Sequence, residues 1–400
     1  MSEDDRDHRI LGQKLDLFHF RDEAPGMVFW HPRGLAMVRE LERAAREQAR
    51  AQGYLEVRTP QVLRRAAWDA SGHFAHFREH MFRIEDQSVE AALKPVSCPG
   101  HLYVASRRAL SYRELPLRYA ELGVVHRDEA SGNLHGLLRV RQFTQDDGHV
   151  LAAWEDIPAE VRAFCAGIRP FYRAFGFDDI ALALSTRPND RAGDDASWDA
   201  AESALRDALV GLGESFVENP GQGAFYGPKI EVSLRDRHGR SWQCGTIQLD
   251  LVMPARFDVR YVDASGLRRV PAMLHRALFG SLERFLGIVL EHHGARLPAW
   301  LAPVQAVVLP VTGEAAAHAE ALARELERND VRALVIAHES LARRIVEAHA
   351  LAAPYVLVVG KNEVRDGTLS LRHHGKNDET LPRAEALSLV TKGVARPSFG

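Results

Sequence analysis

The sequence predicts an α+β fold for about the first 300 of its 400 residues, followed by a smaller α/β domain. Up to about residue 298, short runs with strand-like alternation are interspersed irregularly with amphipathic helical stretches, a pattern typical of α+β proteins. From about residue 304, strands and helices alternate one for one, as they do in α/β units. We therefore predict two domains, residues 1–298 and residues 299–400.

The first domain is expected to contain an early helix and a short strand. Residues 33–52 place their apolar side chains on one helical face, and Gly53 follows as a stop signal. The alternation after it predicts a strand that ends at Pro60. The further elements expected in this domain are strands over 117–125 and 137–151, a helix over 155–176, a strand over 181–188, two strands joined by a turn at 237–239 within 224–254, and a helix or strand-to-helix unit over 273–293.

The second domain follows a change in composition. Residues 295–305, "ARLPAWLAPVQ", contain two prolines and Trp300 and are interpreted as a linker. The elements expected after it are strands over 304–311, 331–338, 354–360 and 368–374, and helices over 315–329, 339–352 and from about 382 onward. This order predicts a compact α/β domain of about 100 residues.

The composition narrows the class of protein. Hydrophobic residues make up 46% and charged residues 26%, which is ordinary for a soluble globular protein. The net charge of −3 argues against a uniformly basic nucleic-acid-binding surface, although 51 Lys and Arg are enough for a local basic groove. Three scattered cysteines predict a reducing compartment rather than a disulfide framework. Because neither a signal peptide nor a membrane span is recognisable, we expect a cytoplasmic protein with no membrane segment.

Cys98 is the first candidate for chemistry. It lies in "LKPVSCPGHLY", residues 93–103, with no second cysteine nearby, so a local disulfide and a CxxC metal knuckle are both excluded. Taken alone, Cys98 is a small buried thiol under a Pro-Gly turn. Any chemical role for it requires partners elsewhere in the chain.

Two further stretches carry polar residues in a suggestive spacing. In "HRDE", Arg127 and Glu129 lie two apart, so in an extended segment they share a face and could hold a phosphate and a base amine together. A cross-strand salt bridge explains the same pair equally well. In "FTQDDGHV", Gln145, Asp147 and His149 alternate along one face of a strand, which favours a lined pocket over a solvated edge.

The stretch "MLHRALFGSLER" adds a histidine and an arginine. A lone histidine such as His275 before a helix is ordinarily a capping or surface residue. Arg284 is harder to dismiss, because an arginine one turn beyond Gly280 in a buried helix must find an anion. The residues alone therefore indicate a polar cleft and leave its ligand open.

Several of these stretches resemble known sequence motifs. "GYLEVRTP", "HRDE…VRQFTQDD" and "FGSLERFLG" resemble motifs 1, 2 and 3 of the class II aminoacyl-tRNA synthetases. Longer stretches, among them "KPVSCPGH", "GAFYGPKIEV", "WQCGTIQLD" and "VPAMLHRALFGSLERF", resemble the threonyl-tRNA synthetase family, from about Asp7 to about Leu389. The resemblance implies an antiparallel sheet flanked by helices, a C-terminal anticodon-binding α/β domain, and a homodimer built on motif 1.

The resemblance also implies a zinc-dependent amino-acid site. One Zn²⁺ per subunit would be held by Cys98, His149 and His275, with the threonine substrate at the open position through its amino group and hydroxyl. Zinc can reject valine, which has the right shape but no hydroxyl. The further residues implied to seat the amino acid are Asp147, which would accept a hydrogen bond from the hydroxyl, Gln145, Tyr226 and, less directly, Lys229.

For ATP, the resemblance implies fixed guanidinium groups acting together with Mg²⁺. Arg127 would hold the α-phosphate and Arg284 the far end of the triphosphate. The other implied ATP contacts are Glu129 on the adenine amine, Phe143 stacked on the base, and Gln243 in the same cleft. His73 matches a histidine near the terminal ribose of tRNA and would assist transfer as a base, although a surface histidine explains it nearly as well.

The implied activity is that of a threonine–tRNA ligase: ATP-dependent activation of L-threonine as threonyl-adenylate and transfer to the 3′ end of tRNA(Thr). The chain starts at the catalytic core, so we expect no editing domain in cis and measurable transfer of serine, which differs by one methyl worth about 1–3 kcal/mol. Val96 and Ser97 depart from the family's common residues beside the zinc. In the C-terminal domain, "LSLRHHG" replaces an arginine-richer strand of the family and "HESLARRI" replaces a "NEKIGFKIR"-like stretch, while Arg343, Arg344 and Arg372 retain some positive charge there.

Three alternatives remain open on the sequence. The first is a paralogue that activates threonine or a related β-hydroxy amino acid for another acceptor, and the second is a catalytically dead RNA-binding regulator. The third is an inhibitor-resistant duplicate, for which changes such as Val96 and Ser97 near the zinc would be expected. The complete set of candidate ligands and arginines argues against the dead regulator, and the anticodon-type domain argues against a carrier-protein ligase.

Overall fold

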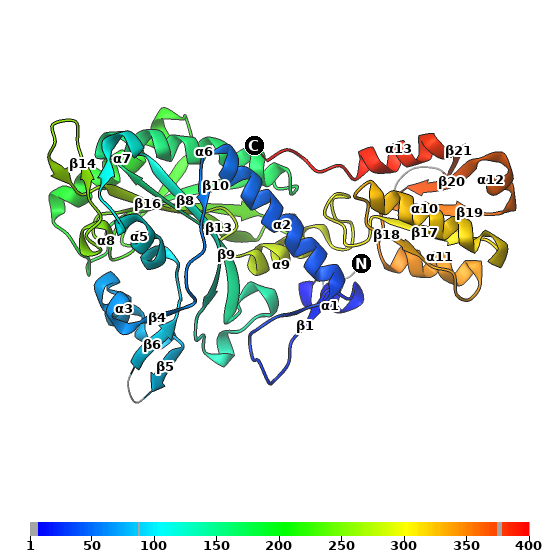
Figure 1. The fold of residues 1–400 in the computed structure, drawn as a ribbon, viewed down its shortest axis with the longest axis horizontal. Coiled ribbons are helices and arrows are strands. Elements are labelled where there is room, and N and C mark those ends of the chain that lie inside the picture. The colour runs from blue at the N-terminus through cyan, green and yellow to red at the C-terminus, as the bar shows by residue number, and fades with distance from the viewer. Residues whose placement is uncertain (1–6, 87–88, 374–377, 400) are drawn as a thin grey trace. The chain divides into compact units, whose positions relative to one another are not determined.

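The computed structural model describes residues 7–86, 89–373 and 378–399, and these fold into two compact units (Figure 1). The smaller unit comprises described residues within Met1–His19, Phe29–Glu40 and Val289–Ser398. The larger comprises those within Phe20–Val28, Leu41–Ile288 and Phe399–Gly400. Because the units interleave along the chain, the predicted boundary at residue 298 stays a prediction. No helix within the described ranges is long and apolar enough to cross a bilayer.

The larger unit is organised around an eight-stranded sheet. The strand order is β11 (Phe216–Asn219), β10 (Ile180–Ser185), β12 (Lys229–Arg235), β13 (Ser241–Asp250), β16 (Ala272–Ala277), β9 (Gln142–Ala152), β8 (Leu117–His126) and β3 (Leu55–Glu56). The outermost pairs, β10–β11 and β3–β8, are parallel and every other pairing is antiparallel. The predicted α+β class is confirmed, and the predicted antiparallel sheet carries a parallel pair at each edge.

The register of the central strands positions the site. His275 on β16 lies opposite His149 on β9 and opposite Gln248 on β13. Glu121 on β8 lies opposite Asp147 on β9. Since residues directly opposite each other in a sheet share a face, these five polar side chains project from the same side.

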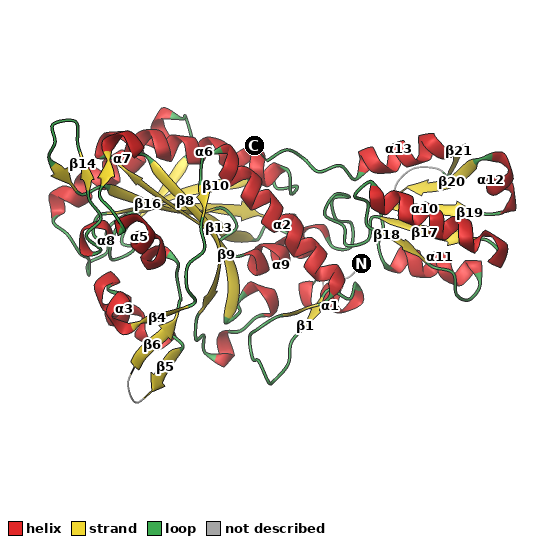
Figure 2. Ribbon diagram, in the orientation of Figure 1, coloured by secondary structure: helices red, strands yellow, loops and turns green. Residues whose placement is uncertain are grey.

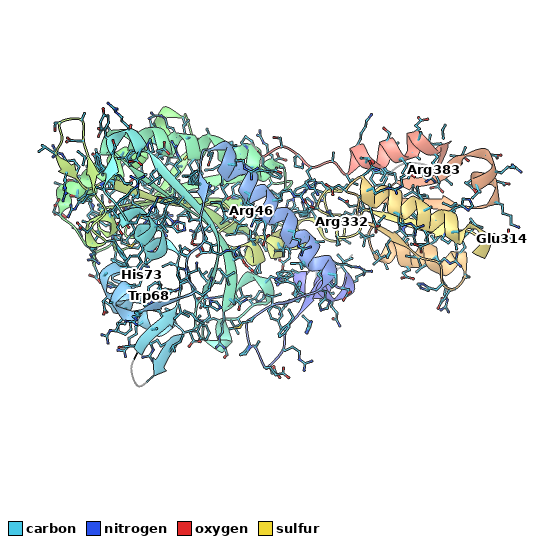
Figure 3. All side chains as sticks on the ribbon, in the orientation of Figure 1. Arg46, Trp68, His73, Glu314, Arg332 and Arg383 are labelled. Atoms are coloured by element: carbon cyan, nitrogen blue, oxygen red, sulfur yellow. The ribbon has the colours of Figure 1, made fainter. Side chains whose placement is uncertain are left out.

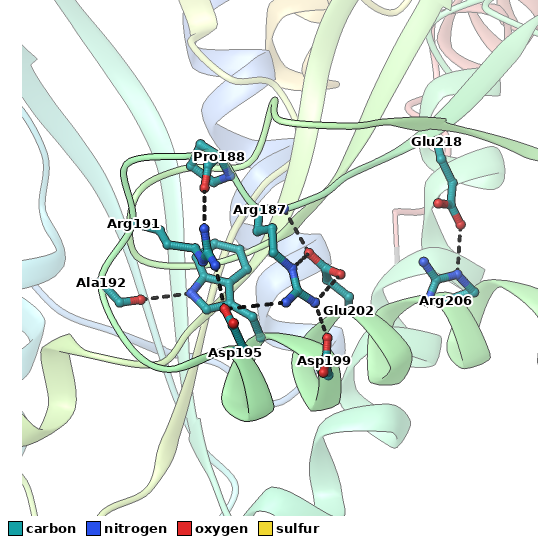
Figure 4. Close-up of polar contacts among 10 residues, drawn as sticks. Arg187, Pro188, Arg191, Ala192, Asp195, Asp199, Glu202, Arg206 and Glu218 are labelled. Atoms are coloured by element: carbon teal, nitrogen blue, oxygen red, sulfur yellow. Dashed lines mark hydrogen bonds and ion pairs between the residues drawn. The ribbon is translucent and has the colours of Figure 1, made fainter.

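Helices α6 (Ile157–Arg173) and α7 (Asp195–Gly211) contact each other in the larger unit (Figure 1). Asp194 caps α7 through the amide of Ser197. Arg187, just beyond β10, is held by Asp199 and by Glu202 at 2.8 Å on α7 (Figure 4). Helix α7 is therefore fastened to the end of β10 by a group of ion pairs.

The larger unit also contains further helices and two small sheets. They are α2 (Pro32–Ala51), shared between the two units along its length, α3 (Arg65–Ser71), α4 (His73–Phe77), α5 (Cys98–Ser106), α8 (Met253–Arg256), α9 (Leu282–His293), likewise shared, the sheet β4 (Val62–Arg64), β6 (Val89–Leu93), β5 (Arg83–Asp86), and the sheet β15 (Arg268–Arg269), β14 (Tyr261–Val262), β7 (Leu110–Ser111). Figure 2 shows these helices and strands by type.

Two expected strands are shorter than predicted. The strand expected to run to Pro60 has only Leu55–Glu56 in the sheet, because the amide of Thr59 donates to the Glu121 carboxylate instead of to a strand. The strand expected over 137–151 begins at Gln142, because residues 136–138 form a 3₁₀ turn. Residues 273–293 form a strand and then a helix, and Gly280 makes the turn between them with φ of 74°.

The smaller unit contains a five-stranded sheet with the order β18 (Ala333–Val335), β17 (Ala306–Pro310), β19 (Tyr355–Val359), β20 (Thr368–His373) and β21 (Glu379–Pro382). Helices α10 (Ala316–Arg328) and α13 (Arg383–Gly393) pack on one face, and α11 (Leu341–Ala350) packs on the other. The predicted α/β alternation is confirmed. Helix α12 (Lys361–Asp366) and β21 were not predicted, and residue 374 of an expected strand lies outside the described ranges.

The N-terminal segment of the smaller unit contains α1 (His8–Lys14) and a two-stranded ribbon, β1 (Phe18–His19) with β2 (Phe29–Trp30). Asp7 caps α1 through the amide of Arg9, and the buried His8 ring is 2.6 Å from the Glu291 carboxylate. Glu40 accepts hydrogen bonds from Arg332 at 2.7 Å and from Arg396 at 2.6 Å.

One buried carboxyl of the larger unit gives a prediction for stability. Burial raises the pKa of Glu283 from 4.5 to about 7, while the Thr144 amide opposes the shift. Between pH 4.5 and 7 the Glu283 carboxyl is ionised in the unfolded chain and protonated in the folded chain. Its contribution to the free energy of unfolding is therefore fully present below pH 4.5 and is lost as the pH rises to about 7. Glu283→Gln should therefore stabilise the protein at pH 8 by up to about 3 kcal/mol and have no such effect near pH 4.5. Denaturation midpoints measured against pH test this.

The matched control is Glu218→Gln. A hydrogen bond from Arg206 lowers the pKa of Glu218, so this substitution should give no gain at high pH. Stability curves for Glu283→Gln and the parent chain that run parallel from pH 4.5 to 8 would contradict the prediction.

Candidate active site

Two adjoining cavities open on one face of the eight-stranded sheet. The donor cavity, named for Cys98, His149 and His275, has a volume of about 150 Å³. The arginine cavity, named for Arg127, Arg139 and Arg284, has a volume of about 260 Å³. Three residues line both cavities: Arg127, Gln145 and Thr246. Molecules bound in the two cavities would therefore meet at these three side chains.

Cys98, His149 and His275 come from three separate elements. Cys98 is the first residue of α5, where Pro99 favours the start of a helix. His149 on β9 and His275 on β16 are brought together by the antiparallel register. One ligand atom from each of the three lies within 4.8 Å of the other two, and His149 Nε2 is 3.0 Å from His275 Nδ1.

This donor set suits a zinc ion. Sulfur and imidazole nitrogen are zinc's usual protein ligands, and two nitrogens bound at about 2.0–2.1 Å to one tetrahedral ion lie about 3.3 Å apart. The group opens into the donor cavity, which leaves a fourth position for a small molecule. His275 is oriented from behind, because its Nε2 lies 2.9 Å from the buried Asp250 carboxylate.

The surroundings set the protonation of the free donors. Burial raises the pKa of the Cys98 thiol well above its ordinary value, and the charges of Asp147 and Asp250 raise it further. Burial lowers the pKa of His149 well below its ordinary value, with contributions from His101 and His275. A neutral imidazole is the form that ligates a metal, and a coordinating thiol loses its proton to the cation's field.

The polar triplet of β9 faces the donor cavity as its alternation predicted. Gln145, Asp147 and His149 all line this cavity. Burial raises the pKa of Asp147, partly offset by His101 and Ser97. Tyr226 also lines the cavity, with its ring centroid 5.5 Å from that of His275.

Arg127 and Glu129 line the arginine cavity together, but not as a strand pair. They follow β8 in a tight turn, in which the Glu129 amide donates to the Arg127 carbonyl at 2.8 Å. Glu129 forms its ion pair with Arg139 at 2.8 Å. The Arg127 guanidinium lies 5.1 Å from the Phe143 ring centroid and donates to the Pro95 carbonyl at 3.3 Å. The expected extended segment is therefore replaced by a turn that still gives both side chains one cavity.

Arg284 enters the same cavity from the first turn of α9. Its guanidinium donates to the carbonyls of Leu138 at 3.1 Å and Gln243 at 3.3 Å. It also lies 5.8 Å from the Trp242 ring centroid. Carbonyl contacts fix the orientation of a guanidinium without neutralising its charge, so Arg284 retains the capacity to bind an anion.

Gln243 and Lys229 were both predicted to line the ligand cleft. Gln243 lines the arginine cavity and donates to Glu231 at 2.7 Å. Lys229 is paired with the same carboxylate at 2.7 Å, and among the described residues it lines neither cavity. The role predicted for Lys229 therefore stays a prediction.

His73 lies at the start of α4, beside Trp68 (Figure 3). Its Nδ1 is 2.8 Å from the Ser71 hydroxyl, and as far as the described residues define the two cavities it lines neither. Burial lowers the pKa of His73 to about 4, with His275 and Arg127 contributing. A neutral but weakly basic imidazole results, and the predicted role in transfer stays a prediction.

Four further residues at the two cavities were not predicted from the sequence: Arg139, Thr246, Gln248 and Asp250. Thr246 and Gln248 line the donor cavity, and Asp250 orients His275. These three alternate along β13 in "TIQLD", the same period-two signal that identified the β9 triplet. Arg139 carries no comparable local signal, because it follows a 3₁₀ turn.

A match to a family model identifies the larger unit, with its sheet and two cavities, as a class II tRNA synthetase core. The model of the tRNA synthetase class II core domain (G, H, P, S and T) matches residues 82–293, and that of the anticodon binding domain matches residues 305–393. The fold is also that of a prolyl-tRNA synthetase from Giardia lamblia, with a TM-score of 0.75 over 98% of this chain and 82% of that chain at 18% identity.

Within that class the relatives are more specific. A threonine–tRNA ligase of Burkholderia lata is 49% identical over 95% of this chain and 60% of its own length. A solved structure described as the RNA binding domain of threonyl-tRNA synthetase from Cryptosporidium parvum has a TM-score of 0.94 and 39% identity, covering 98% of this chain and 99% of that chain. The chain belongs to the threonyl-tRNA synthetase family. It spans about 60% of the length of the curated relatives it matches.

Proposed function

We propose that this chain activates L-threonine with ATP as threonyl-adenylate and transfers the threonyl group to the 3′ end of tRNA(Thr). The observation that carries the proposal is the shared boundary of the two cavities at Arg127, Gln145 and Thr246. An amino acid in the donor cavity and ATP in the arginine cavity would meet there. In activation, a carboxylate oxygen of threonine bonds to the α-phosphorus of ATP, and the bond to pyrophosphate breaks.

The arginine cavity supports the ATP half of the reaction. Negative charge develops on the α-phosphoryl oxygens, and Arg127 lies at the boundary where those oxygens would be. Arg284 would bind the far end of the triphosphate together with Mg²⁺. Glu129 would accept a hydrogen bond from the adenine amine, and Phe143 would stack on the base. The Glu129–Arg139 ion pair would then open or shift when adenine binds.

The donor cavity supports recognition of threonine. Cys98, His149 and His275 would hold a zinc ion. The chemistry that zinc supplies there is coordination of the substrate's amino group and side-chain hydroxyl. Asp147 would accept a hydrogen bond from the same hydroxyl, and Gln145 and Tyr226 would seat the substrate. Valine lacks the hydroxyl and would leave these polar groups unpaired.

The partners follow from the family and from the surface. We propose a homodimer through the motif 1 region, which is supported by the edge strand β3, where Leu55 is 59% exposed. The C-terminal domain would bind the anticodon region of tRNA. The reducing compartment predicted from the cysteine usage is consistent with three cysteines that are buried and free, and we propose a cytoplasmic setting.

Amino-acid-dependent pyrophosphate exchange tests the activation step. We expect exchange with threonine, exchange with serine weaker by about 10–200-fold because one methyl is missing, and none with valine. Adding total tRNA should then yield threonyl-tRNA. Exchange with threonine but no charging of tRNA would contradict the proposal and favour the paralogue that serves another acceptor. Absence of exchange with every β-hydroxy amino acid would favour a catalytically inactive protein.

A further inference from the structure

A buried chain of hydrogen bonds extends from the His149 ring into the protein. His149 Nδ1 lies 2.8 Å from His101 Nδ1, and His101 Nε2 lies 3.1 Å from a Glu121 carboxylate oxygen. His101 is 1% exposed, Glu121 is 4% exposed and His149 is 4% exposed. The proposed mechanism assigns no role to His101 or Glu121. Groups so completely removed from water must pair with one another, and each pairing fixes the position of a proton.

Glu121 ends this series of hydrogen bonds and is held in place by several donors. It also accepts hydrogen bonds from the Thr59 amide at 2.9 Å, the Thr59 hydroxyl at 2.8 Å and Lys94 at 2.9 Å. Burial alone would raise the pKa of the Glu121 carboxyl, but hydrogen bonds from His101, Thr59 and Lys94 hold it at about 2. Glu121 is therefore a carboxylate, which can only accept hydrogen bonds.

The positions of the protons along this series of hydrogen bonds follow from the charge on Glu121. Because Glu121 can only accept, His101 must donate from Nε2, and a neutral His101 then presents an unprotonated Nδ1. His149 must in turn donate from Nδ1, which leaves the lone pair of His149 Nε2 free. Nε2 is the atom that faces His275 in the donor cluster. Metal binding through His149 Nε2 requires this arrangement, because a His101 ring that donated from Nδ1 would leave the His149 proton on Nε2.

We propose that Glu121 and His101 are positioning residues that hold His149 in the one tautomer able to bind the metal through Nε2. This inference rests on the zinc site of the proposed function. It makes the two histidine ligands unequal: a carboxylate, Asp250, holds His275 directly, whereas a carboxylate holds His149 through an intervening imidazole. Such partners behind a ligand commonly change metal affinity by about 10–100-fold when removed.

The competing explanation is that the same bonds only stabilise the fold. Two substitutions of His101 separate the explanations, because each retains one nitrogen position of the ring. In His101→Asn the amide oxygen can take the place of Nδ1 and accept from His149. In His101→Gln the amide nitrogen can take the place of Nε2 and donate to Glu121, but nothing accepts from His149. A purely structural role predicts that both variants lose stability and neither loses zinc affinity.

The full chain is used, and zinc affinity is measured by competition with a chromophoric chelator. Thermal midpoints are recorded in parallel, and the absorption spectrum of the Co²⁺-substituted protein reports the ligand set. We expect His101→Gln to bind zinc about 10–100-fold more weakly than the parent chain and His101→Asn to remain within about threefold. Equal zinc affinity in the two variants, whether unchanged or lowered, would overturn the proposal.

A second measurement needs no substitution. Nitrogen-15 shifts of the histidine rings in the zinc-bound parent chain should show His101 protonated at Nε2 and bare at Nδ1. The opposite tautomer, or a doubly protonated ring, would overturn the proposal even if neither variant folded. Failure of the parent chain itself to bind zinc would instead refute the proposed zinc site, so the two failures are distinguishable.

Discussion

Replacing Cys98 by alanine is expected to remove zinc and threonine activation together. Cys98 supplies the sulfur of a three-residue donor group to which, among the described residues, no fourth His, Cys, Asp or Glu belongs. With two imidazoles left, the site would lose both affinity for the ion and the means to recognise a hydroxyl. The expected loss in threonine-dependent pyrophosphate exchange is on the order of 10⁴-fold, the scale seen when a site built to pair a substrate hydroxyl loses that pairing. Metal analysis of the purified variant should find no zinc.

Cys165→Ala provides the matched control. Cys165 is also buried, but it lies in α6 and faces the helix's packed side. The same change of side chain there should cost some stability and leave zinc content and exchange intact. If Cys98→Ala retained zinc and exchange at the level of Cys165→Ala, the assignment of the donor cluster would be refuted.

The donor cluster illustrates what the residues alone could predict. The face shared by Gln145, Asp147 and His149 follows from the two-residue period of a strand, and in the structure all three line the donor cavity. The partnership of His149 with Cys98 and His275 does not follow from any local pattern. It depends on β16 pairing with β9 and on α5 starting beside them, and both are tertiary choices made across long stretches of chain. Only the family resemblance pointed to it.

Helices α5 and α7 were not predicted from the sequence, and the reasons differ. Helix α7 carried readable signals, because Asp194 is a capping residue and Trp198, Ala201, Leu205 and Leu209 recur at helical spacing. Helix α5 begins Cys98-Pro-Gly, where Gly100 lowers helix propensity, and it forms because tertiary packing overrides that propensity. The short β3 shows the converse: strand-like alternation ends where Thr59 finds a better partner in Glu121.

Replacing Arg127 by alanine is the second change expected to have a large effect. Arg127 lines both cavities, so it is the cationic side chain placed to meet the α-phosphate while an amino acid is bound. Among the described residues, its guanidinium is oriented by the Pro95 carbonyl and the Phe143 ring rather than by an ion pair, which leaves its charge for the substrate. Because the charge on the α-phosphoryl oxygens grows in the transition state, the loss should fall on kcat, by about 10²–10³-fold.

Two further substitutions and one control make the Arg127 prediction specific. Arg127→Lys keeps the charge but not the two-pronged geometry, so it should recover only part of the lost rate. Arg284→Ala should chiefly raise KM for ATP, since Arg284 lines the arginine cavity but not the donor cavity as the described residues define them. Arg235→Ala, which removes an exposed guanidinium paired with Asp179 at 3.3 Å on the same unit, should leave both constants unchanged. Pyrophosphate exchange over a range of ATP concentrations separates these cases. A normal kcat in Arg127→Ala would mean that the α-phosphate is stabilised elsewhere, and the meeting point of the two cavities would then not be the reaction centre.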